Sequence, residues 1–249
     1  MKMKTFNTML KTEFKLSLRG MDMVIFAVIF PAIVAVILGI IFGGKPAFEG
    51  ADYTFFAQSF GAVSSIGICA AGVMGMPLVI SDYRHKKILK RFKVTPVSPS
   101  MLLFVQVVIN FIYSAISMIL IYLMSALFFG FRIQGSFTGF IGSFLLVTLS
   151  IFSIGIMVAA ISPNTKTANI LCSVLYFPML IFSGATLPYE VMPKILQKVV
   201  DFLPLTQGIK LLKGTSLGLP LDNILIPIIV MAAVSAVCIG ISIKYFKWE

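Results

Sequence analysis

The sequence predicts an all-α integral membrane protein with six transmembrane helices. Hydrophobic residues fill 59% of its 249 positions and charged residues only 12%, whereas soluble domains carry about 25% charged residues. Its mean hydropathy is +1.02. Six apolar runs reach the roughly 20 residues that a helix needs to cross a bilayer, at residues 23–43, 55–81, 101–131, 137–161, 168–187 and 224–243. No linker divides them, so we expect residues 1–249 to form a single transmembrane domain.

Basic residues predict the orientation of these spans. An even number of spans places both termini on one side of the membrane, and 14 of the 20 Lys and Arg residues fall on that side. Lys and Arg concentrate in cytoplasmic loops, so we expect both termini in the cytoplasm. The net charge of +11 then reflects segments that flank spans and attract anionic lipid, and we expect no nucleic-acid partner.

The first element is expected to be an amphipathic helix over residues 1–21. Apolar side chains recur every four residues beside a parallel basic row: Phe6, Leu10, Phe14 and Leu18, next to Lys11, Lys15 and Arg19. This spacing favours a helix that lies in the cytoplasmic interface of the membrane. The alternative is an ordinary basic flank that happens to be helical.

A basic loop, residues 82–98, follows span two. Within it Ile88, Leu89 and Phe92 form a short apolar stripe at helical spacing, among six Lys and Arg residues and ahead of Pro96. Proline disfavours helix in the residue before it, so the pattern predicts a short helix. Composition does not decide between a docking site for another protein and a polybasic anchor for anionic lipid.

Residues 188–214, between spans five and six, are too polar to cross a membrane but are patterned like helices. Pro193 suits a first helical turn, the following apolar residues share one face, and Pro204 precedes a second helical turn. Backbone at membrane depth must be covered by protein or by a watery cavity. We therefore expect an outer re-entrant helical hairpin, with a surface-lying interfacial helix as the alternative.

The cysteine and histidine content offers little for catalysis. Cys69, Cys172 and Cys238 all fall inside apolar runs, which predicts small buried side chains rather than a disulfide or metal set. His85 has no cysteine or carboxylate cluster nearby in the sequence. We therefore expect no catalytic residue, no metal site and no enzyme activity in this chain.

Nucleotide binding and ion coupling are equally poorly supported. Gly39 to Lys45 nearly matches a phosphate-binding loop, but Pro46 replaces the hydroxyl residue that would bind magnesium. No Asp or Glu falls at the middle of an expected span, where ion-coupled carriers usually place one. The sequence thus favours an energy source outside the spans and no cofactor bound by this chain.

Two segments carry a family resemblance. Residues 182–214, beginning Phe-Ser-Gly-Ala-Thr-Leu-Pro, and residues 94–99, Val-Thr-Pro-Val-Ser-Pro, are similar to the outer hairpin and to the exit of the coupling helix in ABC type-2 transporter permeases, the membrane subunits of bacterial ATP-binding-cassette drug and antibiotic exporters. In that family an acidic residue is commonly followed by a Gly-Thr pair. Here Asp82 is present, but Lys86, Lys87 and Ile88 stand where the glycine is expected.

The resemblance implies a multi-pass protein of the bacterial cell membrane that works in multidrug efflux or antibiotic resistance. It implies a second permease copy or a related permease, and an ABC ATPase subunit that binds ATP and Mg. The cargo would be a hydrophobic or amphipathic compound, such as a drug, an antibiotic, a lipid-like molecule or a peptide. The implied roles fall on three sets of residues: coupling to the ATPase at Asp82, Arg84, Ile88, Leu89 and Phe92; a substrate path at Asn169, Ser173, Tyr176, Phe177 and Leu180; and an outer gate at Gly184, Pro188, Glu190 and Pro204.

Alternatives remain at the sequence level. Asn and Ser on span five also suit hydrogen bonding between helices, and the polar residues of span three are interpreted as packing: Gln106, Asn110, Ser114 and Ser117. The rival functions are an ion-coupled secondary carrier and a non-transport membrane protein for assembly or anchoring.

Overall fold

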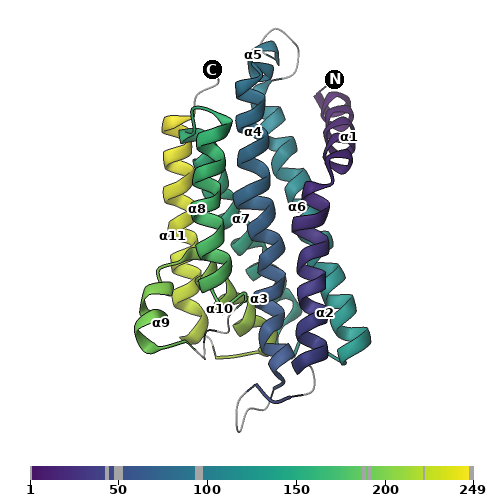
Figure 1. Cartoon of the computed structure of the whole chain (residues 1–249), viewed down its shortest axis with the longest axis vertical. Coiled ribbons are helices and arrows are strands. Elements are labelled where there is room, and N and C mark those ends of the chain that lie inside the picture. Colours follow the sequence, from purple (N-terminus) through teal and green to yellow (C-terminus); the bar gives the residue numbers. More distant parts are fainter. Residues whose placement is uncertain are drawn as a thin grey trace.

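The computed structural model describes residues 2–42, 45–47, 53–92, 98–186, 189, 192–220 and 222–246, which form a bundle of long helices (Figure 1). The elements are α1 (Lys2–Gly20), the π-helix η1 (Val24–Ile29), α2 (Phe30–Phe42), α3 (Phe55–Cys69), the π-helix η2 (Ala70–Gly75), α4 (Met76–His85), α5 (Ile88–Phe92), α6 (Pro99–Phe129), α7 (Phe137–Ile161), α8 (Thr165–Phe182), α9 (Lys194–Val200), α10 (Pro204–Leu217) and α11 (Asp222–Tyr245). Over the described ranges the only β pairing is an isolated bridge between Pro46 and Thr54.

Six helical stretches are long and apolar enough to span a membrane, as the sequence predicts. Spans one to six cover Val24–Phe42, Phe55–His85, Ser100–Phe129, Phe137–Ile161, Thr165–Phe182 and Ile224–Tyr245. The expected all-α fold with six transmembrane helices is therefore confirmed.

Three span boundaries differ from those expected by more than two residues, and one of them is the end of span five, at Phe182 rather than at residue 187. Span five begins at Thr165 because Asn164 caps it, with its Oδ1 accepting a hydrogen bond from the Thr167 N–H at 2.8 Å. Span two continues to His85, supported by a 2.7 Å ion pair between Lys86 and Asp82 on one helical face. It ends where Lys87 adopts a left-handed backbone conformation, φ 57°.

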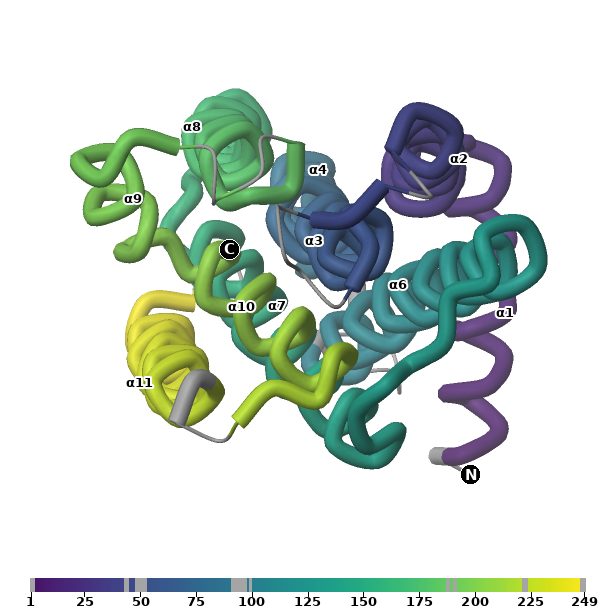
Figure 2. Tube along the Cα trace, turned by 90° about the horizontal axis from the view of Figure 1, so that it is seen from below, coloured from purple at the N-terminus to yellow at the C-terminus, as the bar shows by residue number. Residues whose placement is uncertain are grey.

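Span two, formed by α3, η2 and α4, is the centre of the bundle. Viewed along the bundle it is surrounded by α2, α6, α7, α8 and α10 (Figure 2). Within its most apolar window 83% of residues are buried, against 28% to 33% for spans one, three, five and six. Small residues permit this packing: a β carbon on Gly67 would lie 2.7 Å from the Ala27 carbonyl oxygen of span one.

The two ends of the bundle differ in what they carry. The start of α1, the end of α11 and the short helix α5 lie at one end, here named the termini end, and α9 lies at the other, here named the hairpin end (Figure 1). The start of the first helix and the end of the last helix therefore lie on the same side of the bundle, as six spans require.

Helix α1 lies against α6 through the apolar row seen in the sequence. The rings of Phe6 and Phe104 stand 5.7 Å apart, as do those of Phe14 and Tyr113. The Tyr113 hydroxyl also donates to or accepts from Ser17 Oγ at 3.0 Å. Met21 then takes a left-handed conformation, φ 59°, and separates α1 from span one.

Helices α9 and α10 occupy the segment between spans five and six, and they differ in burial. Ile195, Val199 and the nearby Phe202 are largely exposed around α9, whereas α10 packs against α3, α7 and α11. The fit of α10 on α3 is close, because a β carbon on Gly61 would lie 2.9 Å from the Lys213 backbone nitrogen.

Candidate functional site

The residues expected to couple to an ATPase have unequal access to a partner. Arg84 is 8% exposed, and its Nη1 donates to the carbonyl oxygens of Ala159 at 2.8 Å and Ser162 at 2.5 Å. These oxygens lie at the C-terminal end of α7, whose last carbonyls lack partners within the helix. Arg84 thus binds span two to span four inside the chain.

The remaining coupling residues divide in the same way. Leu89 is 1% exposed and packs in the core, whereas Ile88 is half-buried. The Asp82 carboxylate keeps 34% of its surface and pairs with Lys86. The backbone of Phe92 ends α5, but its side chain and residues 93–97 lie outside the described part of the structure.

The expected substrate path on α8 is split between exposed and packed side chains. Asn169 and Phe177 are exposed, Phe177 by 51%, and Ser173 is half-buried. Tyr176 is 5% exposed and Leu180 is 9% exposed, so both are packed inside the bundle. Only part of this face is therefore free to meet a compound, and the ring of Tyr176 lies 5.6 Å from that of the exposed Phe177.

A cavity of about 590 Å³ opens beside Asn169, and we name it the termini-end cavity. Its wall combines α1, the start of span one, η2, α4, α6 and α8. Its lining residues are Glu13, Leu16, Ser17, Gly20, Asp22, Met23, Met74, Gly75, Leu78, Val79, Asp82, Tyr83, Gln106, Asn110, Thr165, Lys166 and Asn169. Its volume falls in the range of small-molecule sites.

Glu13 holds one side of this cavity together. Its Oε2 accepts hydrogen bonds from the Tyr83 hydroxyl at 2.6 Å and from Gln106 Nε2 at 2.8 Å. Sequence reasoning treated Gln106 as a packing residue and did not pair it with Glu13, 93 positions away. The one sequence signal that points to a special role for Glu13 is that it is the acidic residue of an otherwise basic amphipathic helix.

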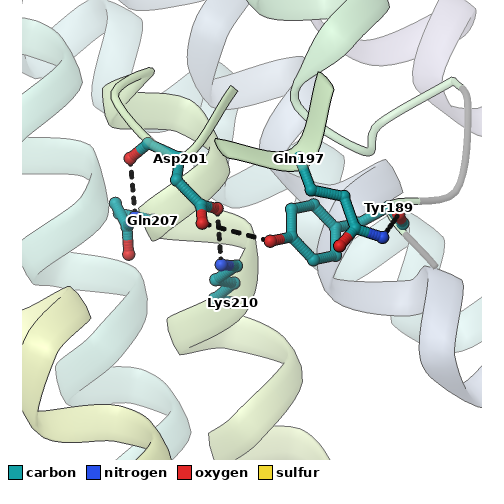
Figure 3. Close-up of polar contacts among 5 residues, drawn as sticks. All are labelled: Tyr189, Gln197, Asp201, Gln207 and Lys210. Carbon is teal, nitrogen blue, oxygen red and sulfur yellow. Dashed lines mark hydrogen bonds and ion pairs between the residues drawn. The ribbon is translucent and has the colours of Figure 1, made fainter. Parts of the chain in front are cut away.

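The hairpin end holds a second polar cluster around Asp201 (Figure 3). The Asp201 carboxylate accepts from Lys210 Nζ at 2.6 Å and from the Tyr189 hydroxyl at 3.1 Å. Gln207 donates to the Asp201 carbonyl at 2.7 Å, and Gln197 donates to the Tyr189 carbonyl at 3.0 Å. The cluster ties α9, α10 and residue 189 to one another.

Two of the expected outer-gate residues, Gly184 and Pro204, lie in the described part of the structure. Gly184 has φ 97°, a conformation that favours glycine, and Pro204 occupies the first turn of α10. Pro188 and Glu190 lie outside the described residues. Gly184 and Tyr189 also line a cavity of about 330 Å³, together with three buried polar side chains whose atoms lack a hydrogen-bond partner: Gln58, Ser183 and Thr206.

The three cysteines match their expected environment. Cys69, Cys172 and Cys238 are free and buried. Among the described residues no group of three or more His, Cys, Asp or Glu side chains is placed to hold a metal ion.

Six apolar helices of spanning length among the described residues define a multi-pass membrane protein. The sequence profile described as ABC-2 type transporter matches residues 4–217. The chain belongs to this family of membrane components of ABC transporters.

Named relatives match shorter segments. The chain is 34% identical over 76 residues to Nodulation protein J of Rhizobium leguminosarum bv. viciae, which covers 30% of this chain and 29% of that protein. It is 30% identical over 101 residues to Nodulation protein J of Neorhizobium galegae, covering 41% of this chain and 36% of that protein. These alignments thus span only about a third of the relatives' length.

Proposed function

We propose that this chain is the permease subunit of an ATP-driven exporter that moves a hydrophobic or amphipathic compound out of the cytoplasm or the inner leaflet. The family match over residues 4–217 carries this proposal. ATP and Mg are bound and used by a separate ABC ATPase. We place both termini in the cytoplasm, so the termini end faces the cytoplasm and the basic loop meets the ATPase there.

The hydropathy of span five supports a second permease subunit. Its best window has a mean hydropathy of 1.3, the lowest of the six, yet only 28% of that window is buried within the chain. Span one is similarly exposed, at 33% buried, but has a mean hydropathy of 3.1. Lipid suits the surface of span one. The exposed side chains of span five mix the polar Asn169 with the apolar Val174 and Phe177. This mixture suits protein and a substrate path, so we propose that span five meets a second copy or a related permease.

The proposal is tested by transport in proteoliposomes that contain this chain and an ABC ATPase encoded beside it. We expect export that requires ATP hydrolysis and persists when ion gradients are collapsed. Transport that runs on an ion gradient without the ATPase would identify a secondary carrier instead. Stable folding with neither ATPase association nor flux would identify an assembly or anchoring protein.

The orientation predicts opposite labelling of the two ends. Single cysteines at Lys86 and at Lys198, both exposed, are introduced after Cys69, Cys172 and Cys238 are replaced by serine or alanine. A membrane-impermeant maleimide added to intact cells should label only the Lys198→Cys protein. The reason is that 14 of the 20 basic residues lie on the side of the termini, which predicts that the termini end, with Lys86, faces the cytoplasm. Labelling of Lys86→Cys from outside contradicts this orientation.

The α8 face predicts a contrast between neighbouring aromatics. Phe177→Ala should leave the fold intact because Phe177 is 51% exposed. It should change the relative transport of different compounds about fivefold, since an aromatic contact is worth about 1 kcal/mol. Tyr176→Ala should instead lower stability by about 3 kcal/mol, because Tyr176 is buried. Equal transport profiles for wild type and Phe177→Ala would remove α8 from the path.

The basic loop predicts a contrast between shape and charge. If α5 docks on the ATPase, Ile88→Ala should reduce co-purification about tenfold, because it truncates an interface contact while keeping every charge. Lys86→Gln combined with Lys87→Gln should have a smaller effect on co-purification that grows with anionic lipid content. If only the charge variant fails, the loop is a lipid anchor.

A further inference from the structure

The termini-end cavity combines apolar side chains with polar and charged groups. Leu16, Met23, Met74, Leu78 and Val79 supply much of its lining. Such a wall binds the hydrophobic part of a compound, and the polar groups decide which head group is accepted. The charges and unpaired atoms of the cavity therefore indicate the substrate class.

The charged groups of this cavity favour a cation. Its lining includes the carboxylates of Glu13, Asp22 and Asp82, and one lysine, Lys166. Lys86 pairs with Asp82. Tyr83 and Gln106, which donate hydrogen bonds to Glu13, are neutral. They therefore fix the Glu13 carboxylate in place without cancelling its charge. Glu13 and Asp22 then outweigh Lys166, in a chain whose net charge is +11.

Asn110 adds an unpaired acceptor to the same wall. It is 2% exposed, and its Nδ2 donates to the Gln106 carbonyl at 2.8 Å, but its Oδ1 has no hydrogen-bond partner. The neighbouring wall residue is Gly75, and a β carbon there would lie 2.8 Å from this Oδ1 and overlap the Met23 sulfur. The oxygen therefore lies against Gly75, and both residues line the cavity. A buried acceptor without a partner is costly, and an N–H donor or a cation would satisfy it.

The backbone around the cavity is also unusual. Met74 and Gly75 belong to η2, and Met23 directly precedes η1, so two π-helical segments border the same space. π-helical turns inside α-helices occur frequently at functional sites. Here η2 supplies two lining residues directly, and η1 follows the lining residue Met23.

We propose that the termini-end cavity binds an organic cation with an apolar body, and that this is the substrate class of the exporter. The proposal rests on the exporter function proposed above. The cation lies near Glu13 and Asp22, its apolar part contacts the methionine and leucine side chains, and Lys166 opposes compounds that carry a negative charge. A free organic cation, rather than the head group of a lipid, is the occupant.

The test compares two ions of the same shape and opposite charge. Purified full-length chain in a neutral detergent is titrated with radiolabelled tetraphenylphosphonium and, separately, tetraphenylborate. We expect at least tenfold tighter binding of tetraphenylphosphonium. Glu13→Gln and Asp22→Asn should each weaken it about tenfold, and Lys166→Gln should strengthen it. Equal binding of the two ions, or unchanged binding by both carboxylate variants, overturns the proposal.

Controls separate charge from folding and from lipid. Asp201→Asn removes a carboxylate at the hairpin end and should leave tetraphenylphosphonium binding unchanged. Asp22 is exposed, so Asp22→Asn keeps the test valid if Glu13→Gln lowers the unfolding temperature. Added phosphatidylcholine should not compete, and complete displacement by it would assign the cavity to a lipid head group and overturn the proposal.

The outcome is distinguishable from that of the exporter proposal. Binding is measured without the ATPase, so cation binding without ATP-driven export would contradict the exporter function and leave the site assignment intact. ATP-driven export of neutral or anionic amphiphiles, with no cation preference in binding, would support the exporter function and overturn the substrate class.

Discussion

Gly155→Ala should destabilise the six-span bundle by about 3 kcal/mol, since overpacking of a close contact typically costs about 1–3 kcal/mol and this contact cannot relax. A β carbon on Gly155 would overlap the carbonyl oxygen of Gly72 in η2. The obstacle is backbone in the most buried span, so no side-chain rotation relieves it. The helices α7 and η2 would have to move apart.

The same helix provides a matched control. Gly142 also lies in α7, but a β carbon there meets nothing within 4 Å. Gly142→Ala should therefore be neutral or stabilising by up to about 1 kcal/mol, because alanine favours helix over glycine. Unfolding in mixed micelles of increasing SDS content measures both variants. Equal midpoints for the two would show that the Gly72 contact does not limit packing.

Arg84→Ala should have a similar effect, a loss of about 3 kcal/mol of stability. The substitution removes two charge-assisted hydrogen bonds to the end of α7 and leaves the Ala159 and Ser162 carbonyl oxygens without that donor. It also removes the guanidinium that lies 5.3 Å from the Phe246 ring centre. Folded yield should fall even when no ATPase is present.

Lys86→Gln is the control for Arg84→Ala. Its ion pair with Asp82 is exposed, 61% at the lysine, and exposed pairs contribute about 0–1 kcal/mol. Stability should therefore change little. If Arg84→Ala folds normally and loses only its association with the ATPase, Arg84 is a docking residue after all and the contact with α7 is incidental.

Sequence patterns predicted the spans well because the bilayer imposes a length and a hydropathy that can be read locally. The fifth boundary moved from 168 to Thr165 because the Asn164 cap lies in polar sequence that hydropathy ignores. A helix-capping residue such as Asn164 can be recognised from the sequence alone.

Long-range contacts were not available in the sequence. Arg84 looks like a surface residue in a basic loop, but its partners lie 75 and 78 positions away on α7. Leu89 likewise looks like part of an exposed stripe and is 1% exposed. The termini-end cavity is assembled from four separate parts of the chain, so no local pattern marks it.

The short, weakly apolar span five has a consequence for how the protein is made. Its 18 residues give a helix of about 27 Å, slightly shorter than the roughly 30 Å of hydrocarbon in a typical bilayer. Together with its mean hydropathy of 1.3 and the internal Pro178, this makes it a poor signal for the cell's insertion machinery. Contacts with α4 can compensate only once span two is already in place. Span five should therefore settle late in biogenesis, and defects in span two should be seen first as misinsertion of span five.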